Sequence, residues 1–153
     1  MLLLITTVVK AQPFADEIKA FKIQDSLNFP QKNTILFVGS SSFRKWTDVQ
    51  SYFPGYKIIN RGFGGSTLPD VIRYADDIIF PYKPKQIVIY CGENDLAVSD
   101  TVTAAMVAER FKSLFLLIRK KMPNVPIAFV SLKPSPSREK LWPKMIAANN
   151  AIK

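Results

Sequence analysis

The stretch ILFVGSSSF, residues 35–43, carries the most information about the fold, because an apolar run ends at Gly39 and delivers three serines. Short β-branched and aromatic runs bounded by glycine are typical of buried strands. Two later stretches repeat this arrangement, YKIINRGFGGST at 56–67 and QIVIYCGEND at 86–95. Ligands of open α/β sheets bind beyond the carboxyl ends of the strands. We therefore expect the three polar loops to converge on one crevice, with a serine as candidate nucleophile.

Strand and helix patterns alternate along the chain, which predicts an α/β domain with a parallel sheet. Strands buried on both faces read as near-continuous apolar runs, and such runs occur at residues 34–38, 56–59, 86–90 and 126–131. Amphipathic or apolar helical patterns occur at residues 14–26, 68–80, 101–122 and 138–152. The loop at 133–137 lies at the same strand ends as the other polar loops, so it either lines the cleft or serves as a rigid connection.

Each polar loop also has a purely structural interpretation. Serines 40–42 could cap the helix that follows them, and Asn94 and Asp95 favour turns. The glycine-rich loop at 62–67 departs from the dinucleotide pattern at Thr67, and it lacks the Gly-Lys-Ser/Thr ending of a phosphate loop. Trp46 and Trp142 are expected in core or rim packing, although they could line a pocket.

Taken together, the three loops resemble the SGNH or GDSL-type hydrolases, which are serine esterases and acylhydrolases. Gly39-Ser40-Ser41 is similar to the first block of that family, usually Gly-Asp-Ser, which implies that Ser41 is the nucleophile. Gly65 matches the glycine of the second block, whose backbone N–H belongs to the oxyanion hole together with that of Ser41. Gly92-Glu93-Asn94-Asp95 matches the third block, Gly-x-Asn-Asp, which implies that the Asn94 side chain donates the remaining oxyanion hydrogen bond.

The resemblance also implies a three-layer αβα, flavodoxin-like parallel sheet. It implies a serine ester hydrolase acting on small acyl esters, with acetylated carbohydrate and lipid as candidate substrates. No metal or organic cofactor is needed for this chemistry. The small acyl ester is the only partner that the resemblance implies, and the sequence gives no indication of the oligomeric state.

The chain departs from the family pattern in two respects. Ser40 stands where the family usually has aspartate. The last block, Asp-x-x-His, supplies the base and its orienting carboxylate, yet the sequence contains no histidine. We interpret the chain as a hydrolase domain that lacks its final strand and helix, and we expect the 153 residues to be inactive as written. The alternatives are a non-catalytic ligand-binding module and a fragment completed by a strand from a partner, which would pair with the exposed sheet edge.

Composition fits a single globular domain. The chain has 153 residues, of which 48% are hydrophobic and 22% charged, enough for one core. Its net charge of +9 is spread along the chain, which argues against nucleic-acid binding but favours anionic substrates through the summed field. Cys91 is the only cysteine, so an internal disulfide and a cysteine-based metal cluster are excluded, and we expect it to be a small buried residue.

The first eleven residues resemble the remnant of a signal peptide. A short apolar run ends at Val9-Lys10-Ala11, similar to a small-residue cleavage site, although no basic segment precedes it. The domain would then cover residues 12–153 and be exported to the periplasm or the medium. If residues 1–11 are instead an ordinary strand, the protein is cytoplasmic. No run in the sequence is long and apolar enough for a membrane span.

Overall fold

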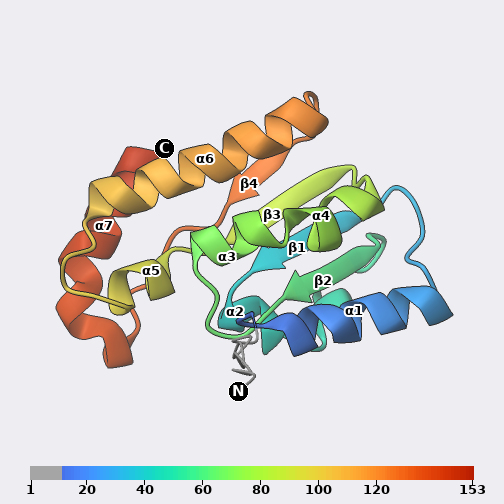
Figure 1. The fold of residues 1–153 in the computed structure, drawn as a ribbon, viewed down its shortest axis with the longest axis horizontal. Coiled ribbons are helices and arrows are strands. Elements are labelled where there is room, and N and C mark those ends of the chain that lie inside the picture. The colour runs from blue at the N-terminus through green and yellow to red at the C-terminus, as the bar shows by residue number, and fades with distance from the viewer. Residues whose placement is uncertain (1–11) are drawn as a thin grey trace, which may run out of the picture.

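A computed structural model describes residues 12–153, so the predicted signal segment lies outside the described residues. The centre of the fold is a parallel sheet with strand order β2-β1-β3-β4 (Figure 1). Its strands are β1 (Ile35–Gly39), β2 (Ile58–Gly62), β3 (Gln86–Tyr90) and β4 (Ile127–Phe129). Every residue of β1 is buried, as expected for a central parallel strand covered on both faces. The predicted α/β fold is confirmed.

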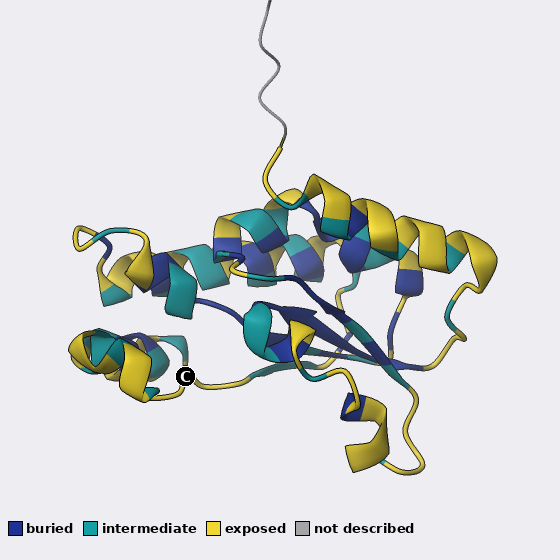
Figure 2. Cartoon of the chain, turned by 90° about the horizontal axis from the view of Figure 1, so that it is seen from below, coloured by how far each residue is buried: buried dark blue, intermediate teal, exposed yellow. Residues whose placement is uncertain are grey.

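Helices lie on both sides of the sheet (Figure 2). The α-helices are α1 (Ala15–Leu27), α2 (Ser41–Arg44), α3 (Leu68–Arg73), α4 (Ala75–Ile78), α5 (Glu93–Ala97), α6 (Ala104–Lys121) and α7 (Trp142–Ile152). The 3-10 turns are η1 (Val49–Tyr52), η2 (Phe80–Tyr82) and η3 (Pro136–Leu141). The side chains of β1 alternate between two clusters. Leu36 and Val38 pack with residues of α1, α3, α4 and α6, whereas Ile35 and Phe37 pack with Phe43 and η1.

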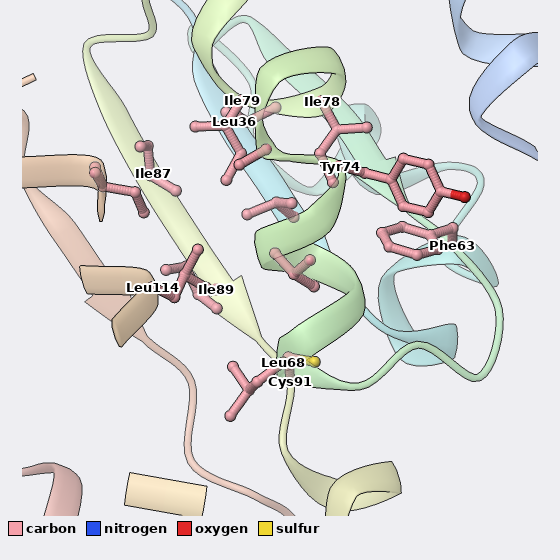
Figure 3. Close-up of a cluster of buried hydrophobic side chains, with 14 of the residues drawn as sticks. Leu36, Phe63, Leu68, Tyr74, Ile78, Ile79, Ile87, Ile89, Cys91 and Leu114 are labelled. Carbon is pink, nitrogen blue, oxygen red and sulfur yellow. The ribbon is translucent and has the colours of Figure 1, made fainter. Parts of the chain in front are cut away.

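The larger cluster supports the carboxyl ends of the strands. Figure 3 shows Ile87 and Ile89 of β3 beside Leu114 of α6, with Leu68 and Cys91 close to the end of the strand. All five side chains are essentially inaccessible to solvent. Burying one Leu or Ile side chain contributes about 1.5–3 kcal/mol. The loops that leave these strands therefore start from a tightly packed base.

The predicted second strand is shifted, because β2 starts at Ile58 and continues through Asn60, Arg61 and Gly62. The strand therefore includes a charged residue, Arg61. Arg61 is nevertheless buried, because its guanidinium pairs with Asp25 of α1 and its Nε donates to the Tyr82 hydroxyl at 2.7 Å. The partners make the extra strand residues possible, since a buried charge is costly unless it is paired and hydrogen-bonded.

Two helix predictions also need correction. The single helix expected at 68–80 is interrupted at Tyr74, which separates α3 from α4 and donates from its hydroxyl to the Pro13 carbonyl at 2.6 Å. The apolar residue Leu27 at the end of α1 lies outside the core, because 83% of its surface is exposed. The predicted helix at 138–152 begins as the 3-10 turn η3 before α7.

Among the described residues, no helix has the length and apolarity that a membrane span requires.

Candidate active site

The serine cluster lies at a sharp turn where β1 ends. Gly39 has φ of 136°, and a Cβ atom at this position would lie 2.1 Å from the Tyr90 carbonyl oxygen. The next residue, Ser40, donates from its backbone N–H to that same oxygen at 3.0 Å. Only glycine fits this close approach of two strands. The turn makes Ser40 the N-cap of α2 and Ser41 its first residue.

Asn94 joins the loops that follow the strands. It is the second residue of α5, and its Nδ2 atom donates to Ser40 Oγ at 2.6 Å and to the Ser66 carbonyl at 3.1 Å. These contacts bring together the loops after β1, β2 and β3, as the sequence predicts. The Ser40 hydroxyl makes no side-chain cap to α2, so the expected capping role of this side chain is replaced by a bond to Asn94.

Ser41 and Asn94 line one pocket of about 410 Å³. All of its lining side chains are polar: Ser41, Ser42, Lys45, Glu93, Asn94, Lys133, Ser135, Ser137 and Arg138. We call it the polar pocket. Three of its lining residues, Lys133, Ser135 and Ser137, belong to the loop at 133–137, so this loop forms part of the pocket wall.

Gly65, the third candidate, is not among the lining residues of the polar pocket. It is exposed, with φ of 74°, and directly precedes Ser66. The Ser66 hydroxyl donates to the Gly39 carbonyl at 3.2 Å, and its own carbonyl accepts from Asn94. Gly65 is thus one residue away from the contacts that hold the three loops together.

The polar pocket carries an excess of positive charge. Lys45, Lys133 and Arg138 line it together with a single carboxylate, Glu93. Arg138 Nε lies 3.8 Å from Glu93 Oε1, and a terminal nitrogen of the same guanidinium donates to Asn94 Oδ1 at 3.3 Å. Lys133 Nζ donates to Ser42 Oγ at 3.2 Å. Such a site favours anionic or strongly polar groups.

Sequence reasoning missed Lys45, Glu93 and Arg138 as members of the site. The position of Glu93 directly before Asn94 was a usable signal. Its Oε2 accepts from the Tyr90 hydroxyl at 2.6 Å, and burial together with this bond raises the pKa of Tyr90 well above its ordinary value. Arg138 follows the cleft loop, but no periodicity in the sequence indicates that η3 points its side chain back at Asn94.

Asp95 anchors the site from behind. It is fully buried, accepts from the Leu68 backbone N–H at 2.9 Å and pairs with Arg110 of α6 at 2.8 Å. Burial raises its pKa, although the bonds from Leu68 and Arg110 act in the opposite direction. The turn interpretation of Asp95 from sequence is therefore incomplete, because its side chain connects α3, α5 and α6.

Cys91 is a core residue, as expected. It is fully buried, its Sγ donates to the Ser66 carbonyl at 3.5 Å, and burial raises the pKa of the thiol well above its ordinary range. The protonated thiol is a poor nucleophile. Cys91 thus contributes packing beneath the site.

No base is in place for Ser41. Among residues 12–153, no side chain accepts a hydrogen bond from the Ser41 hydroxyl, and the sequence contains no histidine. The amine of Lys133 lines the same pocket, but it donates to the Ser42 hydroxyl and not to that of Ser41. The arrangement can hold a polar ligand at Ser41 and Asn94, while proton removal from Ser41 needs a group that these contacts do not provide.

Comparison with solved structures identifies the fold. A GDSL-like lipase from Bacteroides thetaiotaomicron superposes with a TM-score of 0.71 at 19% identity, covering 88% of this chain and 70% of that one. A Streptococcus pneumoniae protein named as a platelet activating factor gives a TM-score of 0.68 at 17% identity over 85% of this chain. A catalytic mutant of an acetylxylan esterase from Geobacillus stearothermophilus gives 0.57 at 15% identity, covering 80% of this chain and 72% of that one.

The chain therefore has the α/β fold of the GDSL-like lipases and acylhydrolases. It spans 59% of the length of the Streptococcus pneumoniae protein. No family model matches the sequence, and no curated protein is similar to it. The fold agrees with the one that the three sequence blocks imply.

Proposed function

We propose that the chain is the nucleophile-bearing part of a serine ester hydrolase, with Ser41 as the nucleophile. The observation that carries the proposal is the placement of Ser41 and Asn94 in one polar pocket at the strand ends. They come from separate sequence blocks of the implied family, and the fold is the one shared with esterases and acylhydrolases. In the reaction, Ser41 Oγ bonds to the ester carbonyl carbon and its proton passes to a base. The C–O bond to the alcohol then breaks, and the base returns the proton to the leaving alcohol. Water finally hydrolyses the acyl-Ser41 ester, which releases the acid and restores the serine.

The developing oxyanion would be held by the backbone N–H groups of Ser41 and Gly65 and by Asn94 Nδ2. Donors aimed at the place where charge develops act in the transition state. Both Nδ2 hydrogens of Asn94 are used, one by Ser40 Oγ and one by the Ser66 carbonyl. A substrate oxygen would therefore replace one of these acceptors, and the Ser40 hydroxyl is the exchangeable one because it can rotate.

The proposed substrate is a small acyl ester on a polar molecule. The polar pocket is lined by hydroxyl, amide and charged groups, which suit a hydroxylated alcohol part. One structural neighbour is an acetylxylan esterase, so acetylated carbohydrate is the first candidate and lipid the second. Export with Gln12 as the first mature residue is a separate proposal, supported by the short apolar run that ends at Val9-Lys10-Ala11.

The test compares the 153-residue chain with a longer version that includes an Asp-x-x-His segment, using a short-chain aryl ester. We expect turnover near background for the first and recovered turnover for the second. In the longer version, Ser41→Ala should abolish acyl-enzyme formation, whereas Ser40→Ala and Ser42→Ala should retain it. Labelling that persists in Ser41→Ala, or that disappears in Ser42→Ala alone, would overturn Ser41 as the nucleophile.

A second candidate function is a non-catalytic binding module. It is favoured by the hydrogen bonds that already occupy Asn94 and by the unpaired Ser41 hydroxyl. A third candidate is a fragment that a partner chain completes with an additional strand. Among the described strands β4 is paired only with β3, and an open sheet edge is a template for another strand. Binding of an acetylated sugar without turnover in the longer version would favour the module. Turnover that appears only on mixing with a partner chain would favour the fragment.

A further inference from the structure

A second pocket adjoins the polar pocket and differs from it in chemistry. It measures about 420 Å³ and is lined by Ser42, Phe43, Trp46, Tyr52, Tyr90, Val130, Ser131 and Lys133. We call it the aromatic pocket. Ser42 and Lys133 line both pockets, so the two pockets adjoin at these residues, and Ser42 directly follows Ser41 in the chain.

The aromatic pocket has a fixed floor and an exposed wall. Phe43 and Tyr90 are buried with ring centroids 5.9 Å apart. Trp46 and Tyr52 form an edge-to-face pair at 5.3 Å, yet 62% of Tyr52 and 40% of Val130 are exposed. Ligand pockets are typically concave and lined by hydrophobic and aromatic side chains with a few polar groups, and the aromatic pocket has this character.

Tyr90 and Lys133 mark the boundary between the two pockets. The Tyr90 ring faces the aromatic pocket, whereas its hydroxyl donates to Glu93 of the polar pocket. Lys133 Nζ lies 5.9 Å from the Tyr90 ring centroid and donates to Ser42. A ligand that crosses this boundary would meet apolar rings on one side and cations on the other.

We propose that the aromatic pocket is an apolar subsite and that the complete site selects amphipathic esters. The apolar acyl or aryl group lies against Trp46 and Tyr52, and a polar, negatively charged group lies between Lys45 and Arg138. This inference rests on the proposed esterase function for the identity of the ligand as an ester. The chemistry of the occupant follows from the two lining residues that the pockets share and from the excess of positive charge in the polar pocket.

The test uses non-hydrolysable probes, so it does not depend on turnover. The chain has two tryptophans. The Trp46 indole reports on the aromatic pocket, while Trp142 Nε1 donates to the Ser135 carbonyl at 2.9 Å and reports on the polar pocket. Their ¹H–¹⁵N indole resonances are assigned with Trp46→Phe and then followed during titration with sodium hexanesulfonate or methanesulfonate.

We expect hexanesulfonate to shift the Trp46 resonance in a saturable manner and methanesulfonate to leave it unchanged. Each buried methylene should tighten binding by up to about fourfold. Tyr52→Ala should weaken hexanesulfonate binding by about tenfold or more. The matched control is Tyr56→Ala, which removes an exposed tyrosine outside the pocket and should not change the affinity. Lys133→Gln should weaken binding and reduce its salt dependence.

Three results would overturn the proposal: no Trp46 shift with hexanesulfonate, equal effects of the two sulfonates, or equal losses in Tyr52→Ala and Tyr56→Ala. A Trp46 shift that depends on protein concentration without ligand would assign the pocket to a second copy of the chain instead. An unreactive Ser41 in the longer version would overturn the esterase proposal, but a hexanesulfonate-dependent Trp46 shift would still support the apolar subsite. Conversely, Ser41 reactivity without a Trp46 response would remove only the subsite.

Discussion

Asn94 Nδ2 donates to Ser40 Oγ at 2.6 Å, which connects the second residue of α5 to the residue before the candidate nucleophile. The family pattern usually has aspartate at position 40, and the serine found here keeps an acceptor for Asn94 without adding a charge. Ser40 is almost fully buried. A neutral acceptor avoids the cost of a buried carboxylate.

Replacing Asn94 should reduce both loop order and catalysis. In the longer, active version, Asn94→Ala should lower kcat by about 10²–10³, because one oxyanion donor is lost. The measurement is steady-state hydrolysis of an aryl acetate. Asn124→Ala provides the control, since Asn124 is exposed and lies outside the polar pocket. An unchanged kcat in Asn94→Ala would remove this side chain from the oxyanion hole.

The 153-residue chain should be a poor esterase. Serine hydrolases that lack a triad member retain only a residual rate of about 10³–10⁴ over water. The sequence has no histidine, and within residues 12–153 no carboxylate accepts a hydrogen bond from Ser41, so we expect turnover of an activated acetyl ester near background. Turnover at ordinary enzyme rates that is lost in Ser41→Ala would show a base other than histidine. Loss of such turnover in Lys133→Ala would identify the amine beside Ser42.

Asp95 should contribute strongly to stability. Asp95→Ala leaves the Leu68 N–H and the Arg110 guanidinium without their buried acceptor, and leaving a buried donor unpaired costs about 1–3 kcal/mol. Chemical denaturation measures the change in the free energy of unfolding. Asp70→Ala is a comparison on the same α3 N-terminus, because Asp70 caps the helix from a partly exposed position. Equal stability of Asp95→Ala and the unmodified chain would contradict the anchoring role.

The same residue should give a defined pH dependence. The pKa of Asp95 is raised in the folded chain, so the native state binds a proton at a higher pH than the unfolded state does. Stability from this group is fully present below the ordinary aspartate value and is lost as the pH rises through the raised pKa. Relative to Asp95→Asn, the unmodified chain should therefore gain stability on acidification across this window. A constant difference between the two variants would contradict the prediction.

Tyr82 should make stability fall at alkaline pH. Burial and the hydrogen bond to Asp25 raise its pKa to about 12. Between the ordinary value near 10 and this raised value, only the unfolded chain loses the proton. The free energy of unfolding should therefore decrease over that interval, and Tyr82→Phe should abolish this component while lowering stability at neutral pH by about 1 kcal/mol. Tyr56→Phe, at an exposed position, should retain the pH dependence.

Sequence patterns predicted the sheet and the loop convergence because strands buried on both faces leave long apolar runs. The run at 86–90 matches β3 residue for residue. The pattern failed where partners distant in sequence decide the structure. Arg61 can lie in β2 because Asp25 neutralises its charge and the Tyr82 hydroxyl accepts a hydrogen bond from its Nε. The break at Tyr74 is likewise invisible in the local periodicity.

The candidate site was predictable in part for the same reason. Ser41 and Asn94 lie in short blocks of recognisable spacing, and the structure places both in the polar pocket. Arg138 and Lys45 have no such block around them. Their inclusion depends on how η3 and α2 are oriented by packing, which no short segment of sequence specifies.

The side chains of α5 point in fixed directions around the helix axis, and this restricts insertions and deletions in the segment. Glu93 and Asn94 face the polar pocket, whereas the next two residues, Asp95 and Leu96, are buried against the rest of the domain. Each added residue rotates a helix by about 100°. A single insertion after Gly92 would therefore turn Asn94 away from Ser40 and Asp95 away from Arg110 at once. We expect relatives of this chain to vary freely in sequence around the turn, but to tolerate neither insertion nor deletion within it.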